Sequence, residues 1–418
     1  MSPSKVVLAY SGGLDTSVAI PWLKEKGYDV VALTVQVGQP LDLVAVRRRA
    51  LAAGASRAYV VDARDEFARA FLQPALAANL LYEGQYPLST ALARPLIGRH
   101  LVEVARKEGA THIAHGCTGK GNDQVRFDVC TAALAPDLKV IAPARVWGMT
   151  RDDEIAYAEA HHVPVPVRRA SPYSTDENLW GRSVECGVLE DPAIEPPEEV
   201  YVWTKSPQQA PHDPSYLRIR FDQGVPTHLD DRPLAFRAIV ERLNELAGQH
   251  GVGRIDHLES RLVGIKSREV YECPAATVLL AAHRALEALV LPRDLLDFKR
   301  TVEMRYSSLV YDGLWYSPLT QALQAFVAST QVRVSGEVAV KLYRGSATVV
   351  GRTSPSALYQ AALATYSQGD QYRAENAEGF IYVWGLPMRT WASLEPSVTA
   401  EPIPAPPLRG KKAAERRR

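Results

Sequence analysis

The sequence has few cysteines and no long apolar run. Only four cysteines occur in 418 residues and none forms a CxxC pair, which excludes a disulfide framework and favours reduced thiols in a cytoplasmic protein. No apolar run approaches the ~20 residues of a transmembrane helix. The five apolar residues before Ser11 are too few for a signal peptide. We therefore expect no membrane partner.

The sequence also has almost no net charge. Its formal value is +1, which gives no overall support for a nucleic-acid partner. The last ten residues, RGKKAAERRR, carry six basic side chains and one acidic side chain, so the preceding residues sum to −4. A hydrophobic fraction of 46% and a charged fraction of 23% are typical of globular proteins and exclude a disordered chain. Without an HExxH motif or clustered Cys and His, the sequence predicts no zinc site.

Residues 1–165 predict a nucleotide-binding α/β domain. Five short apolar runs alternate with helical patterns, which favours a doubly wound parallel sheet with right-handed crossovers. Pro21 predicts a kink or a later start in the first helix, which ends at Gly27. The predicted strands are 5–10, 29–37, 57–63, 111–115 and 138–143, and further helices are 42–53, 66–80, 95–107, 122–134 and 151–161.

Residues 166–390 predict a second, α+β domain. Prolines crowd residues 163–215, a segment interpreted as an extended junction that partly lines a site. Five prolines between residues 396 and 407 favour a disordered tail over 391–418. Strands are expected at 216–221 and 254–265, a hairpin at 338–351, and helices at 235–248, 276–291, 293–310 and 319–331.

The string AYSGGLDTS, residues 9–17, links the first strand to the first helix. Its glycines allow a tight turn, and its backbone N–H groups, with the helix N-terminus, form an anion site. Asp15 would repel a phosphate by itself, so Mg²⁺ between them is the natural interpretation. A Gly-Gly turn alone is common, but the full string resembles the loop of ATP pyrophosphatases. It is neither a Walker A loop nor GxGxxG.

A second polar loop, HGCTGKGNDQVRF, covers residues 115–127 after the fourth predicted strand. It therefore shares the carboxyl edge of the sheet with the phosphate loop, where open α/β sheets bind ligands. Lys120 and Arg126 supply cations and Asp123 a carboxylate, a mixture that suits a zwitterionic amino acid. The alternative is a solvated glycine-rich turn with an N-cap at Asn122.

Six motifs occur in the order found in argininosuccinate synthases, and from about residue 5 to 390 the chain resembles that family. The resemblance implies an ATP-dependent ligase that joins citrulline to aspartate through citrullyl-AMP and releases AMP and pyrophosphate. It also implies a cytoplasmic homotetramer and gives residues 166–390 synthetase and multimerisation roles. The motifs are AYSGGLDTS, LARP (92–95), HGCTGKGNDQVRF, SPYSTDENL (171–179), HGVGRID (250–256) and KSREVYE (266–272).

The resemblance assigns individual residues. The implied ATP contacts are Ala9, Tyr10, Ser11, Gly12, Gly13, Leu14, Asp15, Thr16, Ser17 and Gly116. The implied aspartate contacts are Thr118, Asn122 and Asp123. The implied citrulline contacts are Tyr86, Asn122, Arg126, Ser174, Ser183, Glu259 and Tyr271. Asp15, as the Mg²⁺ ligand, Asp123 and Arg126 are the predicted catalytic residues.

One position departs from the family. Where the family often has a serine that contacts citrulline, this chain has Ala91. Ser89 and Thr90 are the neighbours that could supply the hydroxyl group, and one missing neutral hydrogen bond weakens binding by only ~0.5–1.5 kcal/mol. The activity is therefore expected to survive.

Ordinary structural roles compete with these assignments. Tyr86 could be a packing aromatic, Ser174 and Ser183 could be caps, and Glu259 could lie on a solvated face. A tRNA-modifying ATP pyrophosphatase would need a broad basic face and often a reactive cysteine pair, which this sequence lacks. A non-enzymatic nucleotide-binding module would leave the motifs of the second half without a role. Both Asp123 and the AMP phosphate remain candidate acceptors for the proton of the aspartate amine.

Overall fold

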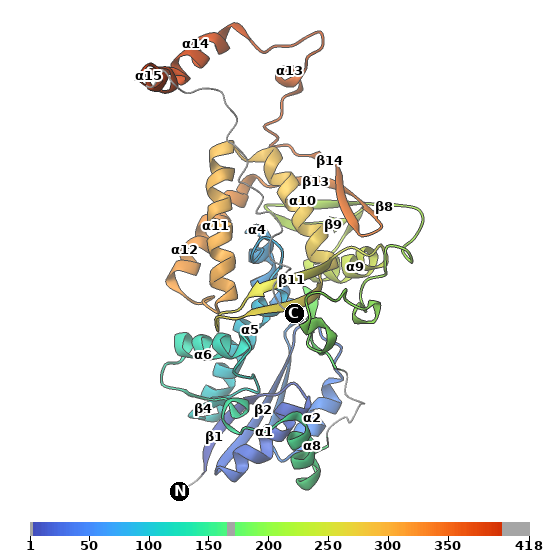
Figure 1. The fold of residues 1–418 in the computed structure, drawn as a ribbon, viewed down its shortest axis with the longest axis vertical. Helices are drawn as coiled ribbons and strands as arrows, with labels where there is room; N and C mark the ends of the chain where they lie inside the picture. Colours follow the sequence, from blue (N-terminus) through green and yellow to red (C-terminus); the bar gives the residue numbers. More distant parts are fainter. Residues whose placement is uncertain (1–2, 165–171, 395–418) are drawn as a thin grey trace, which may run out of the picture. The chain divides into compact units, whose positions relative to one another are not determined.

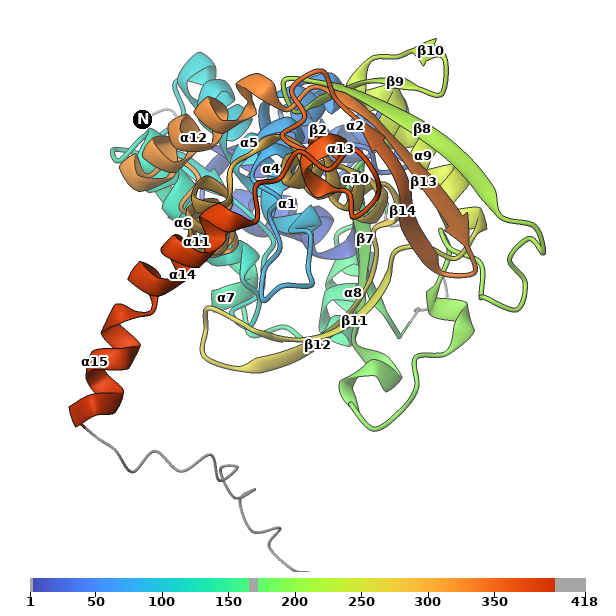
Figure 2. The same cartoon turned by 90° about the horizontal axis from the view of Figure 1, so that it is seen from above.

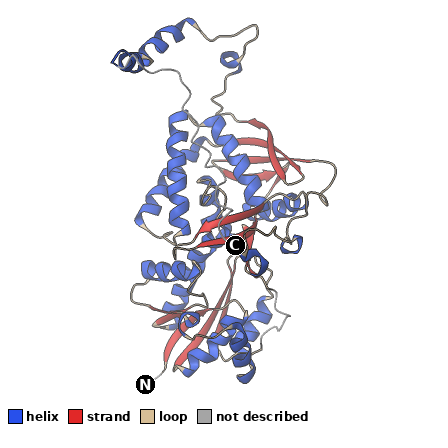
Figure 3. Ribbon diagram, in the orientation of Figure 1, coloured by secondary structure: helices blue, strands red, loops and turns tan. Residues whose placement is uncertain are grey.

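The computed structural model describes residues 3–164 and 172–394. The chain forms two compact units, Met1–Leu358 and Tyr359–Arg418, and each is considered by itself. The described part of the first unit contains three sheets, drawn in red in Figure 3. One is parallel and the other two are antiparallel.

The parallel sheet confirms the predicted doubly wound architecture. Its strand order is β3-β2-β1-β4-β5, and all pairs are parallel. Figure 1 shows α1, α2 and α8 on one side of this sheet and α5 and α6 on the other. The strands are β1 (Ser4–Ala9), β2 (Tyr28–Gln36), β3 (Arg57–Asp62), β4 (His112–Ala114) and β5 (Lys139–Ile141). The helices are α1 (Leu14–Glu25), α2 (Leu43–Ala52), α5 (Ser89–Glu108), α6 (Asp123–Leu134), α7 (Pro143–Val146) and α8 (Arg151–Ala160).

Two helices contain an internal proline, and the later helix start that Pro21 predicted is wrong. Helix α1 starts at Leu14 and runs through Pro21, and α5 begins at Ser89 and runs through Pro95. Both prolines are buried, so packing of the helices outweighs the lost backbone hydrogen bond. The expected helix over 66–80 is instead divided into α3 (Arg64–Phe67), a π-helical turn (Ala68–Leu72) and α4 (Gln73–Ala77).

The second half builds two antiparallel sheets. One has the order β10-β9-β8-β13-β14, and Figure 2 shows these strands beside α9 and α10. Its elements are β8 (Ser215–Asp222), β9 (Val225–Leu229), β10 (Arg232–Pro233), β13 (Gly336–Tyr343) and β14 (Ser346–Thr353), covered by α9 (Phe236–Gln249) and α10 (Pro274–Val290). Helices α11 (Arg293–Tyr311) and α12 (Pro318–Thr330) follow α10.

The other sheet corrects the expectation of an extended junction. Its order is β11-β12-β7-β6, and two of its strands, β6 (Ser174–Asn178) and β7 (Gly181–Glu185), lie inside the proline-rich segment. Their partners are β12 (Lys266–Glu272) and β11 (Arg254–Ser260). Alternating short strands within a proline-rich stretch leave too weak a periodicity to be seen in the sequence.

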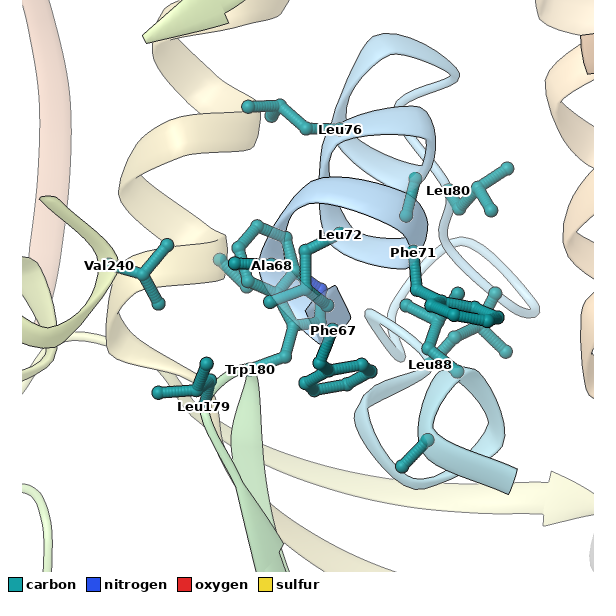
Figure 4. Close-up of a cluster of buried hydrophobic side chains, with 14 of the residues drawn as sticks. Phe67, Ala68, Phe71, Leu72, Leu76, Leu80, Leu88, Leu179, Trp180 and Val240 are labelled. Atoms are coloured by element: carbon teal, nitrogen blue, oxygen red, sulfur yellow. The ribbon is translucent and has the colours of Figure 1, made fainter. Parts of the chain in front are cut away.

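One apolar core crosses from the parallel sheet into the second half. It includes Val7 on β1, Phe67 on α3 and Leu279 on α10, all with no exposed surface. Figure 4 shows Trp180 and Val240, from the later sequence, beside side chains of α3 and the π-helical turn. The walls around the site therefore share one packed interior.

In the described part of the second unit, residues 359–394, three helices carry exposed apolar side chains. The helices are α13 (Ala361–Ala364), α14 (Glu375–Trp384) and α15 (Leu386–Leu394). Helix α15 extends past Trp391, where the tail was expected to begin. The remaining expected tail, 395–418, lies outside the described residues.

A buried carboxylate on α5 links two strands of the parallel sheet. Glu108 accepts hydrogen bonds from Tyr59 (2.6 Å), Arg57 (2.8 Å) and Lys5 (3.1 Å). The bond from Tyr59 and those from the two cations outweigh burial and lower the pKa of Glu108 to about 2. The resulting stability is present above the ordinary carboxyl pKa and is lost as the pH falls from about 4.5 towards 2.

We expect Glu108→Gln to reduce the free energy of unfolding by ~1–3 kcal/mol at pH 7, because buried donors lose a charged acceptor. The deficit should shrink towards pH 3, because the unfolded wild-type chain binds a proton at Glu108 below about pH 4.5, whereas the folded carboxylate, with a pKa of about 2, does not. Urea unfolding at both pH values measures it, with Glu103→Gln, at an exposed position of the same helix, as the control. An equal deficit at pH 7 and pH 3 would contradict this account.

Candidate active site

A pocket of about 540 Å³ lies at the carboxyl edge of the parallel sheet. Its lining comes from the loop between β1 and α1, the end of β2, α5, the loop before α6, and the sheet of β6, β7, β11 and β12. Most of the predicted site residues meet here: Ala9, Tyr10, Ser11, Gly13, Leu14, Asp15, Thr16, Tyr86, Gly116, Asn122, Asp123, Arg126, Ser174, Ser183, Glu259 and Tyr271. Gly12, Ser17 and Thr118 are not in the lining.

The phosphate loop is held by its own side chains. Ser11 Oγ and Thr16 Oγ1 are hydrogen bonded at 3.0 Å, and the buried Tyr10 hydroxyl and Ser17 Oγ are also 3.0 Å apart. Gly12 has φ +81°, a conformation that side chains rarely adopt. The first turn of α1 leaves backbone N–H groups without intrahelical acceptors. Gly12 and Ser17 therefore shape the anion site rather than line it.

Gly116 brings the second loop against the phosphate loop. A Cβ atom at this position would lie 2.9 Å from Thr16 Cγ2, so the approach requires glycine. The buried His115 fixes the loop, since its Nδ1 accepts from the Cys117 N–H (3.2 Å) and its Nε2 bonds Asp128 (2.9 Å). The ring proton therefore sits on Nε2. Thr118 is exposed beyond this point, apart from the pocket.

Asp123 lies between two arginines at the start of α6. Its two carboxylate oxygens are each 2.7 Å from a guanidinium nitrogen, one of Arg94 and one of Arg126. Burial alone would raise the pKa of Asp123, but the two arginines outweigh it and lower the pKa to about 2. Arg94 also pairs with Asp176 on β6. Asp123 is therefore a permanent anion and a weak base.

The turn that carries Tyr86 is clamped from the β6–β7 hairpin. Leu88, directly before α5, has φ +64°, which is strained for a leucine. Trp180 Nε1 donates to the Pro87 carbonyl (3.0 Å), and Asn178 Nδ2 donates to the Ser89 carbonyl (2.9 Å). These bonds to neighbouring carbonyls hold the strained backbone in place.

Ala91 is fully buried on α5 and does not line the pocket. Of its two neighbours, Thr90 lines the pocket, whereas Ser89 is fully buried and absent from the lining. Thr90 is therefore the neighbour placed to supply the hydroxyl group that Ala91 lacks.

The citrulline contacts that the resemblance implies lie on the antiparallel sheet and against it. Tyr86 stacks on Tyr271 with ring centroids 4.1 Å apart, and the Tyr271 hydroxyl donates to Glu259 (2.7 Å). Ser183 lies opposite Tyr271 in the ladder, and Ser174 begins β6. The alternative structural roles fail for Glu259, which is 2% exposed, and for both serines, which are strand residues rather than helix caps. Tyr86 both packs and lines the pocket.

Asn122 directly precedes α6 but does not cap it with its side chain. Its Nδ2 donates to the Tyr311 hydroxyl (2.7 Å), and its Oδ1 accepts from the Leu262 N–H (2.9 Å). The carboxamide is thus directed at the second half of the chain, which overturns the N-cap alternative.

Several site residues were missed by the sequence analysis. Arg94 lies within the LARP motif, and Arg49 on α2 places its Nη2 2.8 Å from where a Cβ of Gly12 would be. The signal for Arg49 was a basic run, 47–49, on the helix after β2. Tyr311 gave no local signal, because its partners are far away in the sequence.

A second carboxyl group faces Asp15. Burial first, and the neighbouring Asp15 second, raise the pKa of Glu154 on α8 to about 8. Two facing carboxyl groups at a phosphate loop fit a divalent cation, which prefers oxygen ligands. Among residues 3–164 and 172–394, no group of three or more His, Cys, Asp or Glu side chains is arranged to hold a metal ion by itself.

Comparisons with known proteins cover nearly the whole chain. Residues 5–164 match the family model "Arginosuccinate synthase N-terminal HUP domain", and residues 173–391 match "Arginosuccinate synthase C-terminal domain". The argininosuccinate synthase of Gloeobacter violaceus is 60% identical over 396 residues, 94% of this chain and 100% of the relative. That of Rubrobacter xylanophilus is 56% identical over 401 residues, 96% of this chain and 98% of the relative.

A solved 4-thiouridine synthetase–RNA complex with bound ATP is 19% identical over 38% of this chain and 41% of its own, with a TM-score of 0.29. That score is too low for conclusions. No helix in the described ranges is long and apolar enough to cross a membrane.

Glu269 on β12 lies among other carboxyl groups of the pocket. Burial, and then Glu259 and Glu185, raise the pKa of Glu269 to about 8, although Arg261 lies 2.9 Å away. The folded protein therefore keeps a proton here that an unfolded chain releases near pH 4.5. The stability of the wild type consequently falls as the pH rises from about 4.5 to 8.

Glu269→Gln should remove this loss, because glutamine stays neutral at every pH. We expect the variant to unfold at a higher urea concentration than the wild type at pH 8.5, and at the same concentration at pH 4. Glu245→Gln, at an exposed position, is the control and should show no such pH dependence. A gain of equal size at both pH values would show that ionisation of Glu269 is not its cause.

Proposed function

Because the chain belongs to the argininosuccinate synthase family, we propose that it joins citrulline to aspartate at the expense of ATP, giving argininosuccinate, AMP and pyrophosphate. One observation carries this proposal. A single pocket is lined by the phosphate loop, by Asp123 and Asn122 of the second loop, and by Glu259 and Tyr271 of the antiparallel sheet. Such a pocket can hold a nucleotide and two amino acids side by side.

The first step forms citrullyl-AMP. The ureido oxygen of citrulline attacks the α-phosphorus, and the bond between the α and β phosphates breaks to release pyrophosphate. The loop supplies N–H groups and the hydroxyls of Ser11 and Thr16, which neutralise developing charge without a covalent intermediate on the protein. Mg²⁺, held by Asp15 with Glu154 facing it, would add charge neutralisation on the phosphates. Arg49 is a further cation beside the loop.

In the second step the aspartate amine attacks the ureido carbon and AMP leaves. The amine must lose a proton, and the low pKa of Asp123 makes that carboxylate a poor acceptor. The phosphate of the departing AMP is the better acceptor, because it becomes a phosphate monoester with a second pKa near ~6 as its bond to the ureido carbon breaks. We assign Asp123 the role of an electrostatic anchor for the ammonium form, and Arg126 that of a citrulline contact that also neutralises Asp123.

We also propose a homotetramer in the cytoplasm. Helices α14 and α15 expose Phe380, Trp384 and Trp391, with 49% to 76% of their surface uncovered in the single chain, and such apolar surface supports contact with other copies. All four cysteines are free thiols, which supports a reducing compartment. Sedimentation of the full chain as a monomer would contradict the tetramer.

A pyrophosphate assay tests the activity. The protein is mixed with ATP and Mg²⁺ and with citrulline, with aspartate, with both, or with tRNA. Pyrophosphate release that requires citrulline, and argininosuccinate that requires both amino acids, are expected. Release stimulated by tRNA instead would favour a tRNA-modifying enzyme, and no release with any addition would favour a nucleotide-binding module.

Asp123→Ala should lower argininosuccinate formation by about 100-fold or more, because the anchor for the aspartate ammonium is lost. ATP binding, measured by calorimetry, should stay within about twofold of the wild-type value. Asp137→Ala, at an exposed position whose aspartate pairs with Arg106, is the matched control. Normal turnover with an unchanged KM for aspartate would refute the role of Asp123.

Asp15→Ala should reduce citrulline-dependent pyrophosphate release by a similar factor, because the proposed Mg²⁺ ligand beside the phosphates is removed. The activity of the wild type should rise with the Mg²⁺ concentration and saturate, whereas the variant should need far more Mg²⁺. Unimpaired pyrophosphate release by Asp15→Ala at limiting Mg²⁺ would show that Asp15 is not the Mg²⁺ ligand.

A further inference from the structure

Tyr311, the last residue of α11, contacts three of the predicted substrate residues but does not itself line the pocket. We propose that Tyr311 is a positioning residue that sets the orientation of Asn122, Arg126 and Glu259 for the reaction. The inference rests on the proposed function, since it concerns the same pocket. It assigns a role to the C-terminal end of a helix that none of the six motifs includes.

The direction of the hydrogen bonds at the Tyr311 hydroxyl is fixed by chemistry. A Glu259 carboxylate oxygen can only accept, so the hydroxyl donates to it at 2.7 Å. The hydroxyl must then accept from Asn122 Nδ2, also at 2.7 Å. Burial, and then Glu259, raise the pKa of Tyr311 far above its ordinary value, so the donated proton stays on the hydroxyl.

The hydroxyl therefore joins an implied aspartate contact to an implied citrulline contact. The other Glu259 oxygen accepts from Tyr271 at 2.7 Å, so both oxygens are oriented by tyrosines. Asn122 is held at its other end by the Leu262 N–H, which leaves one Nδ2 hydrogen available for a substrate. The side chains of Asn122 and Glu259 are both more than nine-tenths buried. If the Tyr311 hydroxyl were removed, water could not readily take its place as their hydrogen-bond partner.

The backbone and the ring of Tyr311 hold Arg126. The Tyr311 carbonyl accepts from Arg126 Nε at 2.9 Å, and the guanidinium carbon lies 4.9 Å from the ring centroid. Two residues on, a Cβ at Gly313 would lie 2.9 Å from Arg126 Cα, so the chain after α11 passes close against α6. Arg126 Nη2 is buried and has no hydrogen-bond partner among the described atoms, which leaves it free to bind citrulline.

The ring also rests on a second aromatic side chain. Tyr82 stacks on Tyr311 with centroids 3.6 Å apart and an angle of 1° between the planes. The Tyr82 hydroxyl donates to the carbonyl of Ser260 (2.8 Å), next to Glu259 in the chain. Stacking of this kind fixes the position of the ring and hence of its hydroxyl.

This arrangement has a direct consequence for the second step. Attack of the aspartate amine on the ureido carbon requires the reacting atoms to be held ~3–3.5 Å apart in the correct orientation. Arg126 lies on α6, Asn122 directly precedes that helix, and Glu259 lies on β11. A shared bridge between these elements therefore sets the relative positions of the two substrates. Loss of the hydroxyl should act on citrulline and aspartate and leave ATP unaffected.

The test compares Tyr311→Phe with Tyr306→Phe. The first variant keeps the ring and the backbone carbonyl and removes only the hydroxyl. The second removes a hydroxyl on the same helix that accepts from Gln324 outside the pocket. KM for citrulline, aspartate and ATP, kcat, the calorimetric affinity for citrulline and the melting temperature are measured for both variants and the wild type.

We expect Tyr311→Phe to raise KM for citrulline by about 10-fold or more and to lower kcat, because a hydrogen bond to a buried charge is lost. KM for ATP should stay within about twofold, and the melting temperature should fall no more than in Tyr306→Phe. Tyr306→Phe should keep all three KM values.

Two kinds of result would overturn the inference. If the wild type is active and Tyr311→Phe matches Tyr306→Phe, or if KM for ATP rises together with that for citrulline, Tyr311 is only a structural residue. If the wild type neither binds citrulline nor forms argininosuccinate, the proposed function is wrong and the inference falls with it.

Discussion

The two walls of the pocket are held together by an arginine that pairs with carboxyl groups on both of them. Arg94 on α5 pairs with Asp123 on α6 and with Asp176 on β6, so one guanidinium joins the parallel-sheet layer to the antiparallel sheet. Within the antiparallel sheet, Arg261 pairs with Glu185 and Glu269. The Arg94 side chain is only 14% exposed, so loss of its carboxyl partners would leave a mostly buried charge without compensation, which is destabilising. The shape of the pocket thus depends on these pairs.

The same groups decide which ligands the pocket favours. Its lining carries seven carboxyl groups, of which Asp15 lies at the phosphate loop, and only three arginines. Such a surface repels polyanions, so in the proposed reaction ATP would depend on backbone N–H groups, the α1 N-terminus and cations beside the loop. The excess of carboxyl groups attracts ammonium groups, which both amino-acid substrates possess. A nucleic acid, with a phosphate at every nucleotide, is disfavoured.

The sequence predicted those helices, strands and loops that local patterns determine. It did not predict the strands whose formation depends on pairing with residues far away in the sequence. Strands of the parallel sheet and the two polar loops follow from apolar runs and glycine placement, and both loops do line the pocket. Strands β6 and β7 were missed, because their pairing with β12 and each other, rather than periodicity, makes them strands. The later start of α1 that Pro21 predicted did not occur, because packing of the buried helix outweighs the backbone hydrogen bond lost at this proline. The site roles taken from the resemblance remain predictions.

Residues that position other side chains need not belong to any sequence motif. Tyr311 lies 189 residues from Asn122 in the sequence, and nothing in its neighbourhood marks it. The single core that crosses from β1 to α10 explains how such a remote residue can act. A close-packed interior is hard to compress or deform. The two walls of the pocket, which share this core, are therefore held in one fixed arrangement. The fold itself then places the two amino acids for reaction, and ATP serves to activate the ureido oxygen of citrulline.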